Sequence, residues 1–164
     1  MTTETPVKHE LAKAEAIAQG IVDRLKPYSD RIEIAGSIRR KRSLVHDIDL
    51  VLIPFYQNQL VQELMAMGGS LKLAGEKLIR LQLPEIQVDL YIATRETWAT
   101  LLLIRTGSTA HNRKLCTMAI YRGMKLHADG SGLTRDGERI AGDTEESIFH
   151  ALGLEYVPPE RREY

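Results

Sequence analysis

Apolar and polar residues alternate with two different periods along the first half of this chain. A helix that closes near Pro27 is predicted to begin with Thr5 as its N-cap and Pro6 at the first helical position. Its apolar stripe recurs at helical spacing and consists of Val7, Leu11, Ala14, Ala18, Ile21 and Leu25. Strands are predicted over 31–35, 47–53, 71–73, 78–83 and 86–92, with a helix over 57–67. This mixed order of strands and helices predicts an α+β fold, in which helices flank a mixed sheet.

The second half of the chain predicts a smaller α/β lobe. Its predicted elements are a helix over 96–104, a turn at Thr106-Gly107, a helix to about Arg122, a hairpin that turns at Asp136-Gly137, and a last helix over 144–152. Asp143 and Glu146 resemble a capping box for that last helix. We therefore expect two lobes, 1–94 and 95–164.

Carboxylates occupy the polar faces of two predicted strands. Asp47 and Asp49 lie on one face of the first strand, and Asp89 lies on the polar face of the second. Carboxylates this close repel one another unless a cation keeps them ionised, and hard oxygen ligands suit Mg²⁺ or Mn²⁺. If the two strands are neighbours, the three carboxylates converge and bridge two such ions. Taken alone, the Asp47-x-Asp49 pair favours a solvated strand or turn over a metal site.

The segment before the first carboxylate has the composition of a phosphate-binding turn. Gly36 allows a close approach of backbone to ligand, Ser37 supplies a hydroxyl group, and Arg39 or Arg40 supplies a fork of donors for phosphate oxygens. The alternative is a basic, solvated loop. Its position directly before the acidic strand favours the anion-binding interpretation.

These residues resemble the family X DNA polymerases, within the nucleotidyltransferase superfamily of DNA polymerase beta. The matching segments are Gly36 to Arg40, Asp47-Ile48-Asp49, Val88-Asp89-Leu90, Thr106-Gly107-Ser108, Asn112, and Val157 to Glu163. They span nearly the whole chain, and the Thr-Gly-Ser and Asn segments are characteristic of the polymerase branch. The resemblance implies a nucleotidyltransferase palm over 1–94 and a thumb-like lobe that binds nucleotide and DNA over 95–164.

The resemblance also implies a role for each matching residue. Asp47 and Asp49 would bind both metal ions, and Asp89 would bind the catalytic one and help to activate the primer 3′-hydroxyl. The residues implied to contact the nucleotide are Gly36, Ser37, Arg40 and His46 at the triphosphate, Thr106 and Gly107 at the sugar, and Asn112 at the minor-groove edge of the base.

Three positions depart from the family pattern. His46 replaces the usual glycine before the first carboxylate, so its imidazole either adds a phosphate contact or points to solvent. Gln87 stands where an arginine often precedes the third carboxylate, which predicts weaker activation of Asp89. Ile104-Arg105 replaces an aromatic pair, which predicts looser discrimination against ribonucleotides.

Composition limits the possible partners and settings. The 164 residues include 22 basic and 22 acidic side chains, so DNA contacts must come from local patches, at 39–42 and at Arg105, Arg113, Lys114, Arg122 and Lys125. A single cysteine excludes an internal disulfide, and no apolar run spans a bilayer. The sequence predicts a soluble, intracellular monomer, cytoplasmic or viral, that is not secreted.

The leading hypothesis is a template-directed DNA polymerase that uses dNTPs, two Mg²⁺ ions (or Mn²⁺) and a DNA primer-template or gapped DNA, with short gap filling in repair as its setting. The first alternative is a template-independent nucleotidyltransferase acting on nucleic-acid ends or on a small molecule. The second is a catalytically silent DNA-binding module. About thirty residues precede the Gly36 turn, which predicts that this chain has neither a lyase domain nor helix-hairpin-helix fingers.

Overall fold

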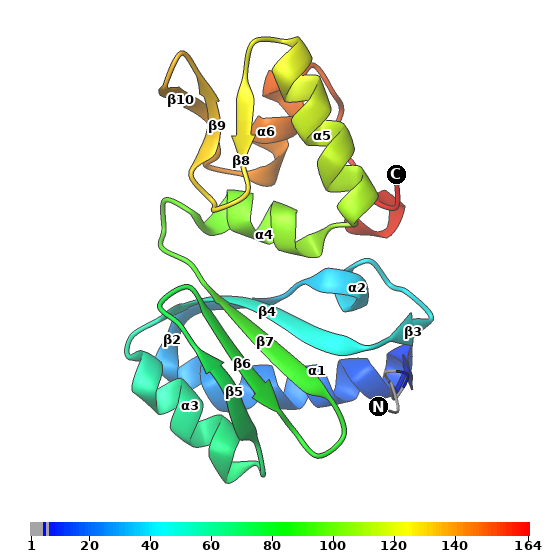
Figure 1. Cartoon of the computed structure of the whole chain (residues 1–164), viewed down its shortest axis with the longest axis vertical. Coiled ribbons are helices and arrows are strands. Elements are labelled where there is room, and N and C mark those ends of the chain that lie inside the picture. The colour runs from blue at the N-terminus through cyan, green and yellow to red at the C-terminus, as the bar shows by residue number, and fades with distance from the viewer. Residues whose placement is uncertain (1–4, 6) are drawn as a thin grey trace.

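Two lobes make up the computed structural model of this chain, which describes residue 5 and residues 7–164 (Figure 1). The N-terminal lobe contains a five-stranded sheet in the order β2-β4-β7-β6-β5, and the C-terminal lobe a three-stranded sheet in the order β10-β9-β8. The predicted α+β class is confirmed. A division at residue 94 stays a prediction, although the large sheet ends at Ile92 and helix α4 begins at Trp98.

All five strands of the large sheet were predicted to within two residues. They are β2 (Ser29–Ile34), β4 (Asp47–Pro54), β5 (Ser70–Ala74), β6 (Leu78–Gln82) and β7 (Gln87–Ile92). β4 and β7 are parallel, whereas the other neighbouring pairs are antiparallel. The sheet is therefore mixed, as the sequence predicts.

The two faces of this sheet have different roles. One face packs against α1 (Leu11–Leu25) and α3 (Gln57–Ala66), which lie along it in Figure 1. The central strands contribute these buried residues to the core: Ile48, Leu50, Leu52, Val88 and Leu90. Because side chains alternate along a strand, the residues between them point to the opposite face, where the three predicted metal ligands lie.

The first helix begins later than predicted. α1 starts at Leu11, Thr5 is exposed and outside any helix or strand, and Val7 is 70% exposed rather than part of the core. Pro6 lies outside the described residues, so its predicted place at the helix start is not described. The remainder of the predicted stripe is correct, because Ala14, Ala18, Ile21 and Leu25 are fully buried.

Contacts with distant segments explain the late start. His9–Glu10 forms strand β1, which pairs with β3 (Leu44–Val45). The Nε2 atom of His9 also lies 2.8 Å from the carbonyl oxygen of Glu85. These long-range hydrogen bonds keep the segment extended, and no local signal reports them.

The C-terminal lobe has the predicted elements with small shifts. They are α4 (Trp98–Thr106), α5 (Thr109–Tyr121), β8 (Lys125–His127), β9 (Gly132–Arg135), β10 (Glu138–Ala141) and α6 (Glu145–Ala151). Thr106, predicted in a turn, is the last residue of α4. Asp136 and Gly137 both have positive φ, at 51° and 79°, as a two-residue hairpin turn requires. Trp98 and Phe149 are core residues, as predicted, with exposures of 4% and 0%.

The cap of α6 lies one residue later than predicted. Thr144 is the N-cap and accepts a hydrogen bond from the backbone N–H of Ser147, whose Oγ accepts one from the N–H of Thr144. Asp143 instead accepts a hydrogen bond from Nη2 of Arg139. The hydroxyl groups of Thr144 and Ser147 therefore form the capping box, in place of the predicted Asp143 and Glu146.

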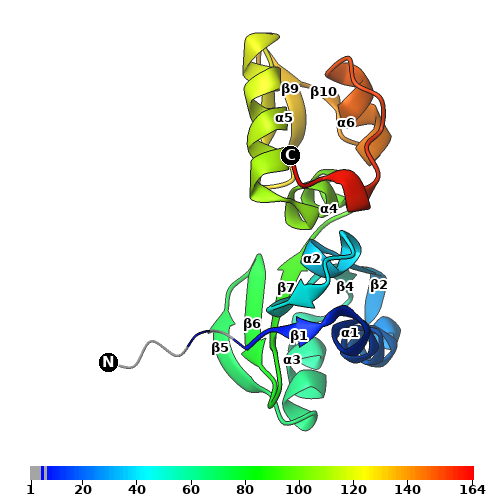
Figure 2. The same cartoon turned by 90° about the vertical axis from the view of Figure 1, so that its right-hand side faces the viewer.

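A buried charge network joins the two lobes where α2 meets α4 and the C-terminal segment (Figure 2). Arg39 donates from Nη2 to Glu145 Oε1 at 2.6 Å and from Nη1 to Thr106 Oγ1 at 2.8 Å. Arg162, fully buried, donates from Nη1 to Glu145 Oε2 at 2.5 Å. Burial acts to raise the pKa of Glu145, but the hydrogen bond from Arg39 and the charges of both arginines outweigh it and lower the pKa.

None of the helices within residue 5 and residues 7–164 combines the length and apolar character that crossing a bilayer requires.

Candidate active site

The strand register brings two of the predicted carboxylates side by side. Asp49 on β4 is paired directly with Asp89 on β7, and Asp47 is paired with Gln87. Residues paired in parallel strands point to the same face, so all three carboxylates share one face of the sheet. Asp89 is buried, with 3% exposure, and Asp47 and Asp49 are partly buried. The condition stated from the sequence, that the two strands are neighbours, is confirmed.

Burial and mutual repulsion together determine the electrostatics of this cluster. Burial, followed by the carboxylates of Asp47 and Asp89, raises the pKa of Asp49 to about 7, against the opposing charges of Arg105 and Arg40. Burial and then the charge of Asp89 also raise the pKa of Asp47. A pKa raised in this way means that the ionised form lacks sufficient positive charge nearby. A divalent cation would supply that charge.

Asp89 is held by an arginine that the sequence pattern did not reveal. Arg80 lies opposite Asp89 in the β6–β7 pairing, with Nε 2.7 Å from Oδ1 and Nη2 3.2 Å from Oδ2. This hydrogen bonding, followed by the charge of Asp89, raises the pKa of the Arg80 guanidinium. A cation does lie beside Asp89 although position 87 is a glutamine, because it comes from the adjacent strand. The sequence did contain a signal for this contact, because Arg80 is the one charged residue in the predicted strand over 78–83. The weaker activation predicted from Gln87 stays a prediction.

A cavity of about 610 Å³ opens between the lobes over Asp47 and Asp49. Its lining includes these predicted nucleotide-binding residues: Gly36, Ser37, Arg40, His46, Gly107 and Asn112. Further positive charge comes from Lys8, Arg42 and Arg105. The cavity thus combines an acidic floor with basic walls, as a metal-bound polyphosphate requires.

The predicted phosphate turn is a single helical turn, α2 (Gly36–Arg39), rather than an irregular loop. Gly36 has a φ of +61°, and a Cβ atom there would lie 2.2 Å from Oδ2 of Asp49. Only glycine therefore fits at this contact. The close packing fixes α2 directly against the carboxylates, so Ser37 and Arg40 are placed on the cavity wall.

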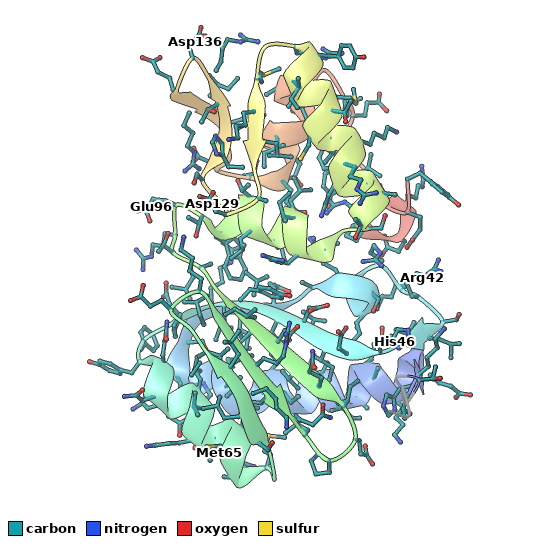
Figure 3. All side chains as sticks on the ribbon, in the orientation of Figure 1. Arg42, His46, Met65, Glu96, Asp129 and Asp136 are labelled. Atoms are coloured by element: carbon teal, nitrogen blue, oxygen red, sulfur yellow. The ribbon has the colours of Figure 1, made fainter. Side chains whose placement is uncertain are left out.

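Arg40 is held from two sides by the C-terminal lobe. Its Nε donates to Oε1 of Glu163 at 3.0 Å, and its Nη1 donates to the carbonyl oxygen of Thr106 at 2.5 Å. Arg42 lies 3.7 Å from the same Glu163 oxygen. Figure 3 shows Arg42 and His46 on the same side of the molecule, near β3. His46 is exposed and lines the cavity mouth, so both roles proposed for its imidazole remain compatible with its position.

Thr106 does not line the cavity. Its side chain is fully buried, because Oγ1 donates to the carbonyl oxygen of Leu102 at 2.7 Å and accepts from Arg39. The neighbouring Gly107 does line the cavity, and its peptide bond to Ser108 is cis. Any contact of this turn with a sugar therefore falls to Gly107 rather than to the Thr106 side chain.

Asn112 lies on the cavity wall, one turn into α5. Its Nδ2 donates to the carbonyl oxygen of Ile104 at 2.8 Å, and its buried Oδ1 has no hydrogen-bond partner within the described residues. The amide NH₂ group carries two donors, so one hydrogen remains for a ligand. Asn112 therefore retains one amide hydrogen that Ile104 does not engage, whereas its Oδ1 is buried.

An aromatic ring does border the cavity, although the aromatic pair before Thr106 is absent. Tyr91 on β7 lines the cavity, and the guanidinium carbon of Arg105 lies 4.2 Å from the centroid of its ring. Burial, followed by the charges of Asp49 and Asp89, raises the pKa of Tyr91 to about 12, so the phenol stays protonated. Tyr91 is the second residue after Asp89 and occupies the same strand face, a signal that the sequence contained.

Of the basic residues predicted to contact DNA, Arg39 and Arg40 are partly buried and pair with Glu145 and Glu163, whereas those of the C-terminal lobe are exposed. In the C-terminal lobe they are Arg105, Arg113, Lys114, Arg122 and Lys125. Their exposure leaves them available for phosphate contacts.

The three carboxylates are not gathered into a ready-made ion site. Among residue 5 and residues 7–164, no group of three such side chains lies close enough to hold an ion as it stands. The reason is that both oxygens of Asp89 face Arg80. The donor set still fits Mg²⁺ or Mn²⁺, because it consists of oxygens only and repels itself.

Two comparisons with known proteins agree with this arrangement. The family model described as DNA polymerase beta thumb matches residues 101–163. The DNA polymerase/3′-5′ exonuclease PolX of Bacillus subtilis (strain 168) is 28% identical over 165 residues, which cover 96% of this chain and 29% of that protein. The chain thus spans less than a third of this relative's length. The thumb match and the alignment over nearly the whole chain show that this chain is similar to DNA polymerases of this kind.

Proposed function

We propose that this chain is a template-directed DNA polymerase, which adds deoxynucleotides to a primer 3′-hydroxyl and releases pyrophosphate. In this proposal residues 1–94 form the palm and residues 95–164 the thumb. One observation carries it: Asp47 and Asp49, the second of which is paired with Asp89 in the strand register, line a cavity whose opposite wall belongs to the lobe that matches the polymerase thumb.

The bond changes follow from this arrangement. The primer 3′-oxygen attacks the α-phosphorus of the dNTP, and the bond from that phosphorus to the bridging oxygen of pyrophosphate breaks. Asp47, Asp49 and Asp89 would hold two Mg²⁺ ions, with Mn²⁺ as a substitute. When bound, these ions lower the pKa of the attacking hydroxyl and stabilise the charge on the leaving pyrophosphate. Asp89 helps to activate the hydroxyl, while Arg80 orients its carboxylate.

The remaining residues place the nucleotide. Ser37 and Arg40 bind phosphate oxygens, with His46 at the cavity mouth as a further candidate. Gly107 packs against the sugar, and Asn112 offers its free amide hydrogen to the minor-groove edge of the base. The formal net charge of zero supports short DNA contacts, and hence gap filling by a monomer rather than extended synthesis.

Primer extension with Mg²⁺ tests the proposal. Single-stranded, recessed and one-nucleotide-gapped substrates are each offered one dNTP at a time, with Asp49→Asn as the matched variant. We expect incorporation only of the nucleotide complementary to the template, most efficiently at the gap, and none by the variant.

Other outcomes would replace the proposal. Products whose identity ignores the template base would establish the template-independent nucleotidyltransferase instead. Binding of gapped DNA without incorporation under any of these conditions would establish the silent DNA-binding module.

A further inference from the structure

The C-terminal segment lies between the two lobes and contacts both walls of the cavity. η2 (Pro159–Arg161) leads into Arg162 and Glu163, which follow the surface between α2 and the start of α5 (Figure 2). The backbone of the segment is anchored at Ser108: its N–H donates to the carbonyl of Arg162 at 2.7 Å, and its Oγ donates to the carbonyl of Glu163 at 2.7 Å.

The side chain of Glu163 reaches the phosphate-binding turn. Its Oε1 accepts from Nε of Arg40 at 3.0 Å and lies 3.7 Å from Nη1 of Arg42. Arg40 is 15% exposed and Glu163 is 28% exposed, whereas Arg42 is 54% exposed. The Arg40 contact is therefore the more protected of the two, and screening by solvent weakens the Arg42 contact most.

These contacts leave Arg40 in one orientation. Glu163 engages Nε and the carbonyl of Thr106 engages Nη1, which leaves Nη2 for a ligand in the cavity. The guanidinium group of Arg40 lies against Gly107, where an added Cβ atom would come within 3.1 Å of Nη1. An arginine held at two of its three nitrogens has lost most of its rotamer freedom before a ligand arrives.

On the basis of the polymerase function proposed above, we propose that Glu163 is a positioning residue, which orients Arg40 toward the β- and γ-phosphates of the incoming nucleotide. Its carboxylate binds Nε rather than Nη2, and Glu163 is not among the residues that line the cavity, so we infer that it does not compete with the phosphates. A competing role and a positioning role for Glu163 predict opposite effects. Removal of a competitor would tighten triphosphate binding, whereas removal of a positioning residue would weaken it.

Equilibrium binding separates these effects without turnover. Isothermal titration of dATP and of dAMP, in Ca²⁺ and without primer, is performed on the full-length wild type, Glu163→Ala, Glu163→Gln and the control Glu160→Ala. Glu160 is exposed and lies in the same segment. Thermal unfolding of each variant confirms that it is folded, and the backbone anchors at Ser108 do not depend on the Glu163 side chain.

We expect Glu163→Ala to weaken dATP binding roughly three- to tenfold, the cost of ordering one free arginine side chain, and to leave dAMP binding nearly unchanged. Glu163→Gln, which keeps an acceptor for Nε, should recover part of the affinity, and Glu160→Ala should bind as the wild type does. Equal or tighter dATP binding by Glu163→Ala would overturn the proposal, as would an equal loss for dATP and dAMP.

Failure of the polymerase proposal is recognisable separately. A weakened triphosphate affinity in Glu163→Ala, together with no templated incorporation by the wild type, would retain the role of Glu163 and reject the polymerase. A wild type that binds no dATP would reject both.

Discussion

Replacing Asp49 with asparagine should stabilise the metal-free protein while abolishing its activity. The pKa of Asp49 is raised from 3.8 to about 7, so between these values the folded protein holds a proton that the unfolded chain has released. Its contribution to stability therefore falls as pH rises through this window, and the loss is complete above about pH 7. Asparagine keeps the shape of the side chain and removes the charge.

The size of this change in unfolding free energy follows from the pKa shift of Asp49. One pH unit is worth about 1.4 kcal/mol, so the stability advantage of Asp49→Asn should widen by about 3 kcal/mol between pH 5 and pH 8. Urea unfolding followed by circular dichroism in EDTA measures the difference at each pH.

Adding Mg²⁺ should narrow the difference in stability between the two proteins. A ligand that binds only the folded state stabilises it, by about 1.4 kcal/mol at a free concentration ten times its Kd. The wild type should gain this at pH 8, and Asp49→Asn should not. The exposed Glu160→Gln controls for the loss of one negative charge. An advantage of Asp49→Asn that is the same at pH 5 and pH 8 would refute the burial argument, and equal Mg²⁺ stabilisation of both proteins would refute Asp49 as a ligand.

Three further changes have defined outcomes. Arg80→Gln should lower the single-turnover rate roughly tenfold, because Asp89 loses its bidentate partner; an unchanged rate would contradict this role. Glu145→Ala should cost about 3 to 5 kcal/mol in urea unfolding at pH 7, because it leaves the buried Arg162 unpaired, and a loss below 1 kcal/mol would be inconsistent with the network. In the wild type this contribution is present above the ordinary glutamate pKa and is lost as pH falls through the lowered pKa of Glu145. Because the aromatic pair before Thr106 is absent, the wild type should prefer dNTP over rNTP only modestly, and Tyr91→Ala should reduce that preference further in single-turnover incorporation. Ordinary selectivity of the wild type would contradict this prediction.

The metal-ligand face could be predicted because strand periodicity is local. Alternation alone fixes which residues share a face, so Asp47, Asp49 and Asp89 were assigned correctly to polar faces. The pairing of β4 with β7 is not local, since a helix and a hairpin intervene between these strands. Without that register, the partner of Asp89 could not be identified, and Arg80 was missed for this reason.

Errors at the ends of helices have a similar origin. The Thr5-Pro6 start signal is sound by itself, but pairing of His9–Glu10 with β3 overrides it. The contact of Arg40 with Glu163 joins residues 123 positions apart and leaves no trace in either local pattern. Sequence periodicity therefore predicts faces, whereas contacts between lobes depend on tertiary structure.

The two halves of the candidate site consequently differ in what holds them. The carboxylates belong to neighbouring strands of one sheet, so their geometry is fixed by backbone hydrogen bonds within the N-terminal lobe. The phosphate-binding turn is fixed to that sheet by the contact of Gly36 with Asp49, but its successive arginines are held by Glu145 and Glu163 from the C-terminal lobe. A shift between the lobes would leave the carboxylate face intact and would move the partners of both arginines. Nucleotide affinity should therefore respond to the lobe junction, whereas metal affinity should respond mainly to the sheet.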